Sequence, residues 1–228
     1  MSLRIVLLLV IINISLTAQS KYPADSLLTS DSLNLAQKAG VLPIAAWQRL
    51  SYNLPGLGCQ FYPSCSNYGA QAIHQHGLLA GAVVTADRIV RCNPAAWDQH
   101  LHSGGRFHEP DGRLVDPVVP APADSNTAVK SPLLAATLST FLPGSGRAYA
   151  GRPWDGFFGF LTVAATASVA HSALHLDRPI EAGIFLSLAA VFYAGEIYGA
   201  WRAARYFRPR LQIPSVEVLE SIDVNGKY

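Results

Sequence analysis

The chain has 228 residues, of which 50% are hydrophobic and 14% are charged, and its formal net charge is +2. This length allows one or two domains with enough chain to bury a core. The high apolar share and low charged share favour a membrane protein. Nucleic-acid binding is disfavoured, because neutralising phosphates requires a clustered basic surface and the basic residues form no long run.

The first residues are typical of an export signal. Arg4 precedes an apolar run over residues 5–16, and Ala18-Gln19-Ser20 supplies the small residues that a signal peptidase reads. The run is short for a membrane-spanning helix. We therefore expect a signal peptide at residues 1–20, with an uncleaved anchor or an interfacial helix as the alternative.

Residues 21–43 are polar and are expected to form a spacer. A helix is predicted next, because apolar residues recur at helical spacing: Ile44, Trp47, Leu50 and Leu54. Pro55-Gly56 ends it, since proline cannot continue a helix. Such a stripe suits either a membrane surface or a protein core.

The most distinctive stretch runs from Cys59 to Pro94 and holds all three cysteines. Ser64 or Ser66 can cap a helix that is expected to stop at Gly77. A second helix, residues 79–90, places small and branched residues on one face. Three charged residues lie largely away from that face: Asp87, Arg88 and Arg91. We expect a helical hairpin on which the three cysteines could converge.

The chemistry of the cysteines is left open by the sequence. Thiolates and a histidine together suit zinc, and the candidate fourth ligands are His74, His76, His100 and His102. The spacing is not that of a zinc knuckle, so a packing cluster or one disulfide is favoured. Cys65 at a helix start could be a nucleophile, but no orienting residue accompanies it. We expect no catalytic residue, no metal and no cofactor.

The chain becomes loop-like from residue 93 to residue 130, and residues 121–131 read as a linker. Residues 132–210 form a predicted transmembrane region, followed by a tail over residues 211–228. Two apolar stretches, residues 157–176 and 180–200, are each long enough to cross a bilayer. They must be helices, because only helices satisfy their own backbone groups in lipid. The fold class is therefore all-α, a small cysteine-containing hairpin followed by a transmembrane hairpin.

The orientation has two readings. Arginines crowd both ends of the long hairpin and favour the cytoplasmic side there: Arg147, Arg152, Arg202, Arg205, Arg208 and Arg210. With a genuine signal peptide the cysteine hairpin starts outside, so residues 133–150 cross as a kinked third span. The alternative keeps that hairpin in the cytosol and needs two spans. The signal peptide and the arginines together favour the arrangement with three spans.

Ionisable residues inside the apolar stretches are usually purposeful. His171 and His175 are four residues apart and share a helix face. Glu196 lies about eleven residues deeper in the hairpin than His171, roughly 16 Å at the helical rise, so the three do not form one site. We expect Glu196 to pair with Arg147 or Arg152.

The cysteine stretch resembles the YidD family of membrane protein insertion efficiency factors. The family pattern reads C-R-F-x-P-[ST]-C-S-x-Y, then a helix ending in HG, then R-C-H-P and D-P-V-P. The matching residues, taken as candidates for partner contact, are Cys59, Phe61, Pro63, Ser64, Cys65, Ser66, Tyr68, His76, Gly77, Arg91, Cys92, Pro94, Asp116, Pro117 and Pro120. Asn93 stands where the family tends to have histidine, and the segment between Cys92 and Asp116 is longer than the pattern.

The resemblance implies a YidD-like module over residues 44–120. It implies a non-enzymatic accessory factor that assists insertion or assembly of integral membrane proteins at the bacterial inner membrane. The expected partners are the lipid bilayer and the insertion machinery or nascent membrane proteins, with no small-molecule substrate. The alternative is a membrane-bound zinc or thiol-redox protein that uses Cys59, Cys65 and Cys92.

Overall fold

The computed structural model describes residues 22–54, 57–119 and 130–206. The predicted signal peptide, most of the linker, the tail and Pro120 lie outside these residues. Most of the described chain is helical and its two strands have two residues each, which confirms the all-α fold class. The elements in chain order are α2 (Pro23–Thr29), α3 (Leu35–Ser51), β1 (Phe61–Tyr62), α4 (Cys65–His76), α5 (Leu78–Arg91), α6 (Ala96–His102), β2 (Leu114–Val115), α7 (Pro132–Phe141), α8 (Ser145–Tyr149), α9 (Pro153–His175) and α10 (Pro179–Arg205).

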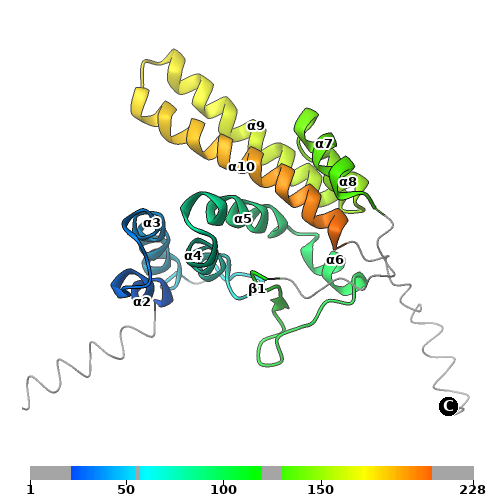
Figure 1. Ribbon diagram of the computed structural model, residues 1–228, viewed down its shortest axis with the longest axis horizontal. Helices are drawn as coiled ribbons and strands as arrows, with labels where there is room; N and C mark the ends of the chain where they lie inside the picture. Colours follow the sequence, from blue (N-terminus) through cyan, green and yellow to red (C-terminus); the bar gives the residue numbers. More distant parts are fainter. Residues whose placement is uncertain (1–21, 55–56, 120–129, 207–228) are drawn as a thin grey trace, which may run out of the picture.

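Two parts are visible in Figure 1. Elements α2 to β2 form one part, here called the cysteine module. Helices α9 and α10 form a long antiparallel pair, here called the arm, which projects past the module. The end of the arm where α9 starts and α10 ends is its base, and α7 and α8 pack there.

Helix α3 starts earlier than the apolar stripe alone indicated. The Asn34 side chain accepts a hydrogen bond from the Gln37 backbone N–H, and the Gln37 side chain accepts one from the Asn34 N–H. This capping box fixes the helix start, so α3 begins within the stretch read as a spacer. The buried face of α3 carries Val41, Ala45 and Gln48.

The predicted hairpin is formed by α4 and α5. The Ser64 hydroxyl accepts a hydrogen bond from the Asn67 N–H at the start of α4, as the sequence indicated. Gly77 joins the two helices at φ +81°, a conformation that a side chain would strain. Gly81 lies directly against the backbone of Ile73, so the missing side chain allows the helices to approach closely.

A short parallel pair closes the module. Phe61 pairs with Leu114 and Tyr62 with Val115. Because β2 lies far along the chain, this pairing brings the residues after Val115 back to the start of α4 and the end of α5. The longer segment between Cys92 and Asp116 thus forms α6, a loop and β2 within the module.

The arm has the predicted hairpin form. Helices α9 and α10 contain 23 and 27 residues and are apolar enough to cross a membrane. Residues 133–150, the candidate third span, are instead broken after Phe141 into α7 and α8. Among the described residues, two helices have membrane-crossing length.

The module is packed against the base half of the arm. Helix α5 lies along α10, where Gly195 leaves room for Ala86. Tyr198 of α10 packs on the module core of Tyr68, Ala72 and Val84. Helix α5 is therefore covered on two sides, by α4 and by the arm.

Candidate functional site

A buried ion-pair network joins the cysteine module to the arm. Asp87 of α5 is fully buried and receives three arginines. Its carboxylate lies 3.0 Å from Arg91 Nε, 2.8 Å from Arg147 Nη1 and 3.4 Å from Arg202 Nη1. Arg147 also lies 2.9 Å from Glu196, which confirms the pairing expected for that glutamate.

Asp116, just after β2, forms the second centre of the network. It pairs with Arg91, lies 3.1 Å from Arg88 Nε and lies 3.1 Å from Arg202 Nη2. Asp87 and Asp116 thus share Arg91 and Arg202. The Asp-Pro motif that stood out in the sequence therefore supplies a carboxylate that binds the arm to the module.

Asn93 makes a further link to the arm. Its side-chain amide donates hydrogen bonds to the Val90 carbonyl at 3.1 Å and to Asp155 Oδ1 at 2.6 Å. Asp155, at the start of α9, also pairs with Arg152 at 2.6 Å. The residue that departs from the family pattern is thus one that contacts the added arm.

The carboxylates of the module are held in their ionised form. Burial alone would raise the pKa of Asp87, but Arg91, Arg147 and Arg202 hold the pKa well below its usual range. Asp116 is held in the same way. Burial raises its pKa, but Arg91, Arg202 and Arg88 lower the pKa by more. At neutral pH both groups are therefore anions.

Small residues of the arm make room for this network. A side chain on Gly159 would collide with the Glu196 carboxylate, and one on Gly199 would collide with Arg147 and Asp87. At Gly159 and Gly199 the small residue admits the buried charged groups.

The three cysteines converge on the module. Their sulfur atoms all lie within 4.8 Å of one another, and Cys59 Sγ lies 3.4 Å from Cys65 Sγ. The thiols are free and half-buried. The Cys65 N–H, at the start of α4, donates to Cys59 Sγ at 3.3 Å. Hydrogen bonds from Cys65 and Cys92 lower the pKa of Cys59 far below its usual range, which favours its thiolate.

The candidate histidines do not join the cysteines. Among the described residues, the group of clustered ligand atoms consists of the three sulfurs. His100 Nε2 instead lies 2.8 Å from the Arg106 carbonyl, and His74 and His76 are exposed on α4. His171 and His175 share a face, with their Nε2 atoms 3.1 Å apart, as expected.

Several motif residues have structural contacts. The Arg88 guanidinium lies 3.6 Å from the Phe61 ring centroid and donates to the Pro63 carbonyl at 3.2 Å. Tyr68 is fully buried. Ser66 Oγ accepts a hydrogen bond from the buried Gln48 at 3.3 Å. The motif residues that remain exposed are His76, Pro94 and Pro117.

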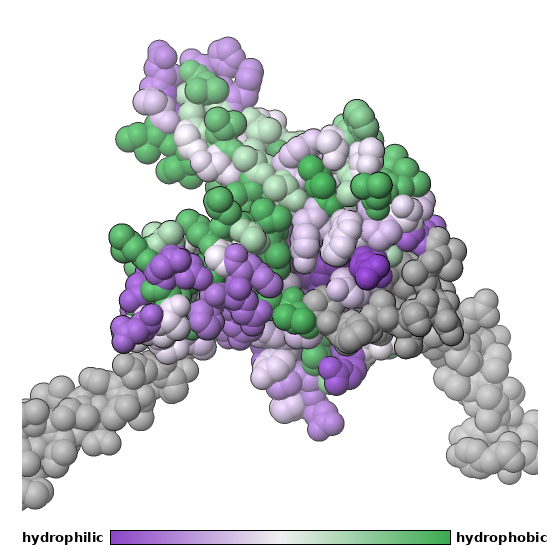
Figure 2. All heavy atoms as spheres, viewed as in Figure 1, coloured by the Kyte–Doolittle hydropathy of each residue, from purple (hydrophilic) through white to green (hydrophobic). Residues whose placement is uncertain are grey.

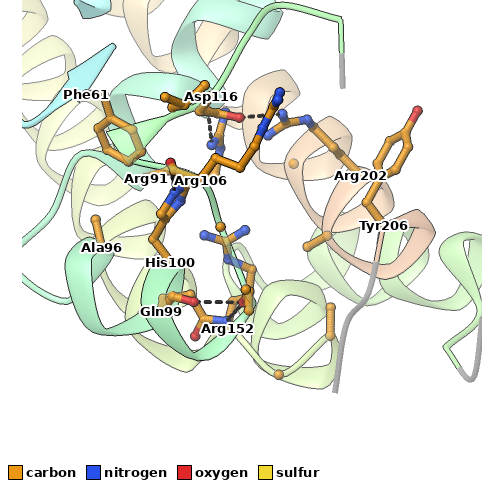
Figure 3. Close-up of a pocket in the computed structure, with 18 of the residues that line it drawn as sticks. Phe61, Arg91, Ala96, Gln99, His100, Arg106, Asp116, Arg152, Arg202 and Tyr206 are labelled. Atoms are coloured by element: carbon orange, nitrogen blue, oxygen red, sulfur yellow. Dashed lines mark hydrogen bonds and ion pairs between the residues drawn. The ribbon is translucent and has the colours of Figure 1, made fainter. Parts of the chain in front are cut away.

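A cavity of about 420 Å³ opens where α5, α6 and the loop after it meet the base of the arm. Figure 3 shows the guanidinium-bearing side chains that line it. Four arginines line this cavity, against one carboxylate, Asp116: Arg91, Arg106, Arg152 and Arg202. Sequence reasoning missed the cavity, because its walls come from segments far apart in the chain.

Comparison with known proteins gives one family. The YidD family model, described as "Putative membrane protein insertion efficiency factor", matches residues 36–100. The matched range starts in α3 and ends in α6. No solved structure matches the chain.

Similar proteins carry the same description. One from an Exiguobacterium species is 43% identical over 68 residues, which cover 30% of this chain and 70% of that relative. One from Escherichia coli is 34% identical over 93 residues, covering 41% of this chain and 92% of the relative. One from Proteus mirabilis is 35% identical over 97 residues, covering 42% and 95%.

The network predicts a large loss of stability for Asp87→Asn. The substitution leaves buried Arg147 and Arg202 facing a neutral amide, and breaking a buried pair in this way costs about 3–5 kcal/mol. Thermal unfolding of the full chain in detergent measures the change. Asp31→Asn, at an exposed position, is the control and should change stability by less than about 0.5 kcal/mol. An Asp87→Asn protein as stable as the control would contradict the network's role.

Proposed function

Because the chain belongs to the YidD family of membrane protein insertion efficiency factors, we propose that it is a membrane-anchored, non-enzymatic accessory factor that assists insertion or assembly of integral membrane proteins. The observation that carries this proposal is the buried ion-pair network, which fixes the family module to one end of an apolar arm. The arm lies beyond the range that the family model matches.

The arm has the dimensions and surface of a membrane anchor. Helices of 23 and 27 residues are about 34 and 40 Å long at the helical rise, against about 30 Å of hydrocarbon. Figure 2 shows hydrophobic side chains along the projecting arm and hydrophilic ones at its tip. We infer that the arm crosses the bacterial inner membrane as two spans.

The network also constrains the topology. Asp87 touches Arg147 and Arg202, and this contact supports an arrangement in which the module and the base of the arm lie on the same side of the bilayer. It therefore favours two spans over the three-span arrangement, in which the two parts lie on opposite sides. Arginines at the base favour the cytoplasmic side, so we infer that the module faces the cytoplasm.

Helix α3 provides a surface for contact with other polypeptides or lipid. Of the predicted stripe, Ile44 packs against the module core, whereas Trp47 and Leu50 are exposed, at 53% and 63% of their full exposure. Leu35 and Leu42 continue it along the helix. A contiguous exposed apolar surface marks an interaction site. A module held at the membrane surface could present this stripe to nascent transmembrane segments or to the insertion machinery.

The topology can be measured with short epitope tags in the full chain. Tags in the Gly112 turn and after Tyr228 should both be accessible only from the cytoplasm, whereas a tag in the Asp177 turn should be accessible only from outside. Antibody labelling of intact and permeabilised cells distinguishes the sides. A Gly112 tag on the opposite side from the Tyr228 tag would contradict the docked arrangement.

The proposed role predicts slower insertion of membrane proteins in cells that lack the gene. The wild-type chain should restore the rate, and Trp47→Gln/Leu50→Gln should restore it several-fold less, because the apolar contact surface is lost. Lys38→Gln on the same helix is the control. Pulse-labelling of a panel of inner-membrane proteins measures the rate. Normal insertion rate and yield in the deleted strain would refute the role.

The converging sulfurs favour a second candidate function, a thiolate metal centre. Three thiolates suit a soft ion such as Zn²⁺ or Cu(I). The three cysteines belong to three segments of the module: the residues before β1, the start of α4 and the end of α5. A bound ion would stabilise the module at that junction.

Metal analysis of the purified full chain tests this candidate. The expected result is one zinc per chain after Zn²⁺ addition, lost in Cys92→Ser and retained in His76→Ala. A zinc-free protein in which a thiol count finds two cysteines oxidised would replace the metal centre with a disulfide.

A further inference from the structure

The cavity at the base of the arm has an excess of positive charge. Four arginines line it, and Asp116 is the one carboxylate in its wall. Arg91 and Arg202 divide their ion pairs between Asp116 and Asp87, and Arg152 pairs with Asp155. Arg106 is exposed and makes no ion pair with any residue in the described part of the chain. The wall therefore carries more arginines than carboxylates, which favours an anionic ligand over a cationic one.

Unused hydrogen-bond donors point to the same conclusion. Arg91 Nη2 and Arg202 Nε are buried and have no hydrogen-bond partner within the described residues, and both residues contribute to the wall of the cavity. Buried donors left without an acceptor are costly. Guanidinium groups match the oxygen atoms of a phosphate with paired, charge-assisted hydrogen bonds. In Figure 3, Arg91 and Arg202 flank Asp116, and Arg106 extends across the same space.

The depth of the cavity matches the edge of the hydrocarbon layer. Gly199 lines the cavity, and Pro179 starts α10 at the far tip. The helix between them is about 30 Å long at the helical rise, which equals the thickness of a bilayer core. Trp154 and Trp201 are exposed near the base, where aromatic side chains anchor a protein at the headgroup level.

From these three observations we propose that the cavity binds the phosphate of an anionic phospholipid headgroup. A volume of about 420 Å³ accommodates a phosphate with its glycerol. Tyr206 in the wall offers a hydroxyl group for the neutral part of the headgroup. A basic pocket beside membrane helices is the arrangement that recognises such lipids. A lipid bound in the cavity would thus contact both the base of the arm and the module.

A lipid is favoured over a soluble anion because of the cavity's place. The acyl chains would lie along the exposed apolar surface of the arm, whose first helix, α9, starts directly after Arg152. Their burial adds affinity that a free phosphate lacks. This inference requires the arm to cross a bilayer but does not require any role in insertion.

Lipid titration of the full chain in an uncharged detergent tests the proposal. Phosphatidylglycerol should bind at one molecule per chain by native mass spectrometry and should raise the unfolding temperature. Phosphatidylcholine should do neither, because its choline cation faces the arginines. Inorganic phosphate, as the soluble probe, should bind much more weakly than phosphatidylglycerol.

Arg106→Gln is the matched variant, because this side chain lies outside the buried network. Loss of one charged donor should weaken phosphatidylglycerol binding by about tenfold. Arg49→Gln removes the same charge from α3, away from the cavity, and should bind as the wild type does. Arg106→Glu should abolish binding while the protein still unfolds at the wild-type temperature in lipid-free detergent.

Three results would overturn the proposal. Equal binding by wild type and Arg106→Gln would remove the cavity from the interaction. An equal loss of binding in Arg49→Gln would show that the lipid responds to the overall surface charge and not to the cavity. Inorganic phosphate bound as tightly as phosphatidylglycerol would assign the cavity to a soluble anion. Because this experiment measures lipid binding, a negative result would refute the lipid site alone. The proposed role in insertion is tested separately, by the pulse-labelling assay.

Discussion

The Asp87 carboxylate is the interaction on which the arrangement of the whole molecule depends. It is fully buried and contacts arginines from α5, α8 and α10. A buried charge is tolerated only when it is well paired. Because the partners come from both parts of the chain, the need to compensate this one group fixes the module against the base of the arm. The cavity follows from that docking, because its walls come from both parts.

Much of the fold could be predicted from local sequence signals. The Ser64 cap, the Gly77 terminator and the long apolar helices are determined by residues close in sequence, and each is present. The pairing of Glu196 with Arg147 was also predicted, because depth along a membrane helix can be counted from its turn. Convergence of the cysteines followed from their positions at the ends of the hairpin elements.

The network itself could not be predicted in the same way. The one local signal was the i, i+4 pair of Asp87 and Arg91, a spacing that is common on solvated helix faces. The sequence placed these residues away from the apolar face of α5, and they are nonetheless buried because the arm covers that side. Arg202 lies 115 residues from Asp87, so no spacing rule connects them. The cavity could not be predicted either, because its walls also come from segments that lie far apart in the sequence.

The long separation of these partners sets an order of events during synthesis of the protein. The ribosome releases Asp87 well before Arg147, and Arg202 emerges only with the final turns of α10. Until then Asp87 lacks its full set of partners. The module can therefore complete this network only after the last helix of the arm has been synthesised, so docking of the two parts is the closing step in building the chain.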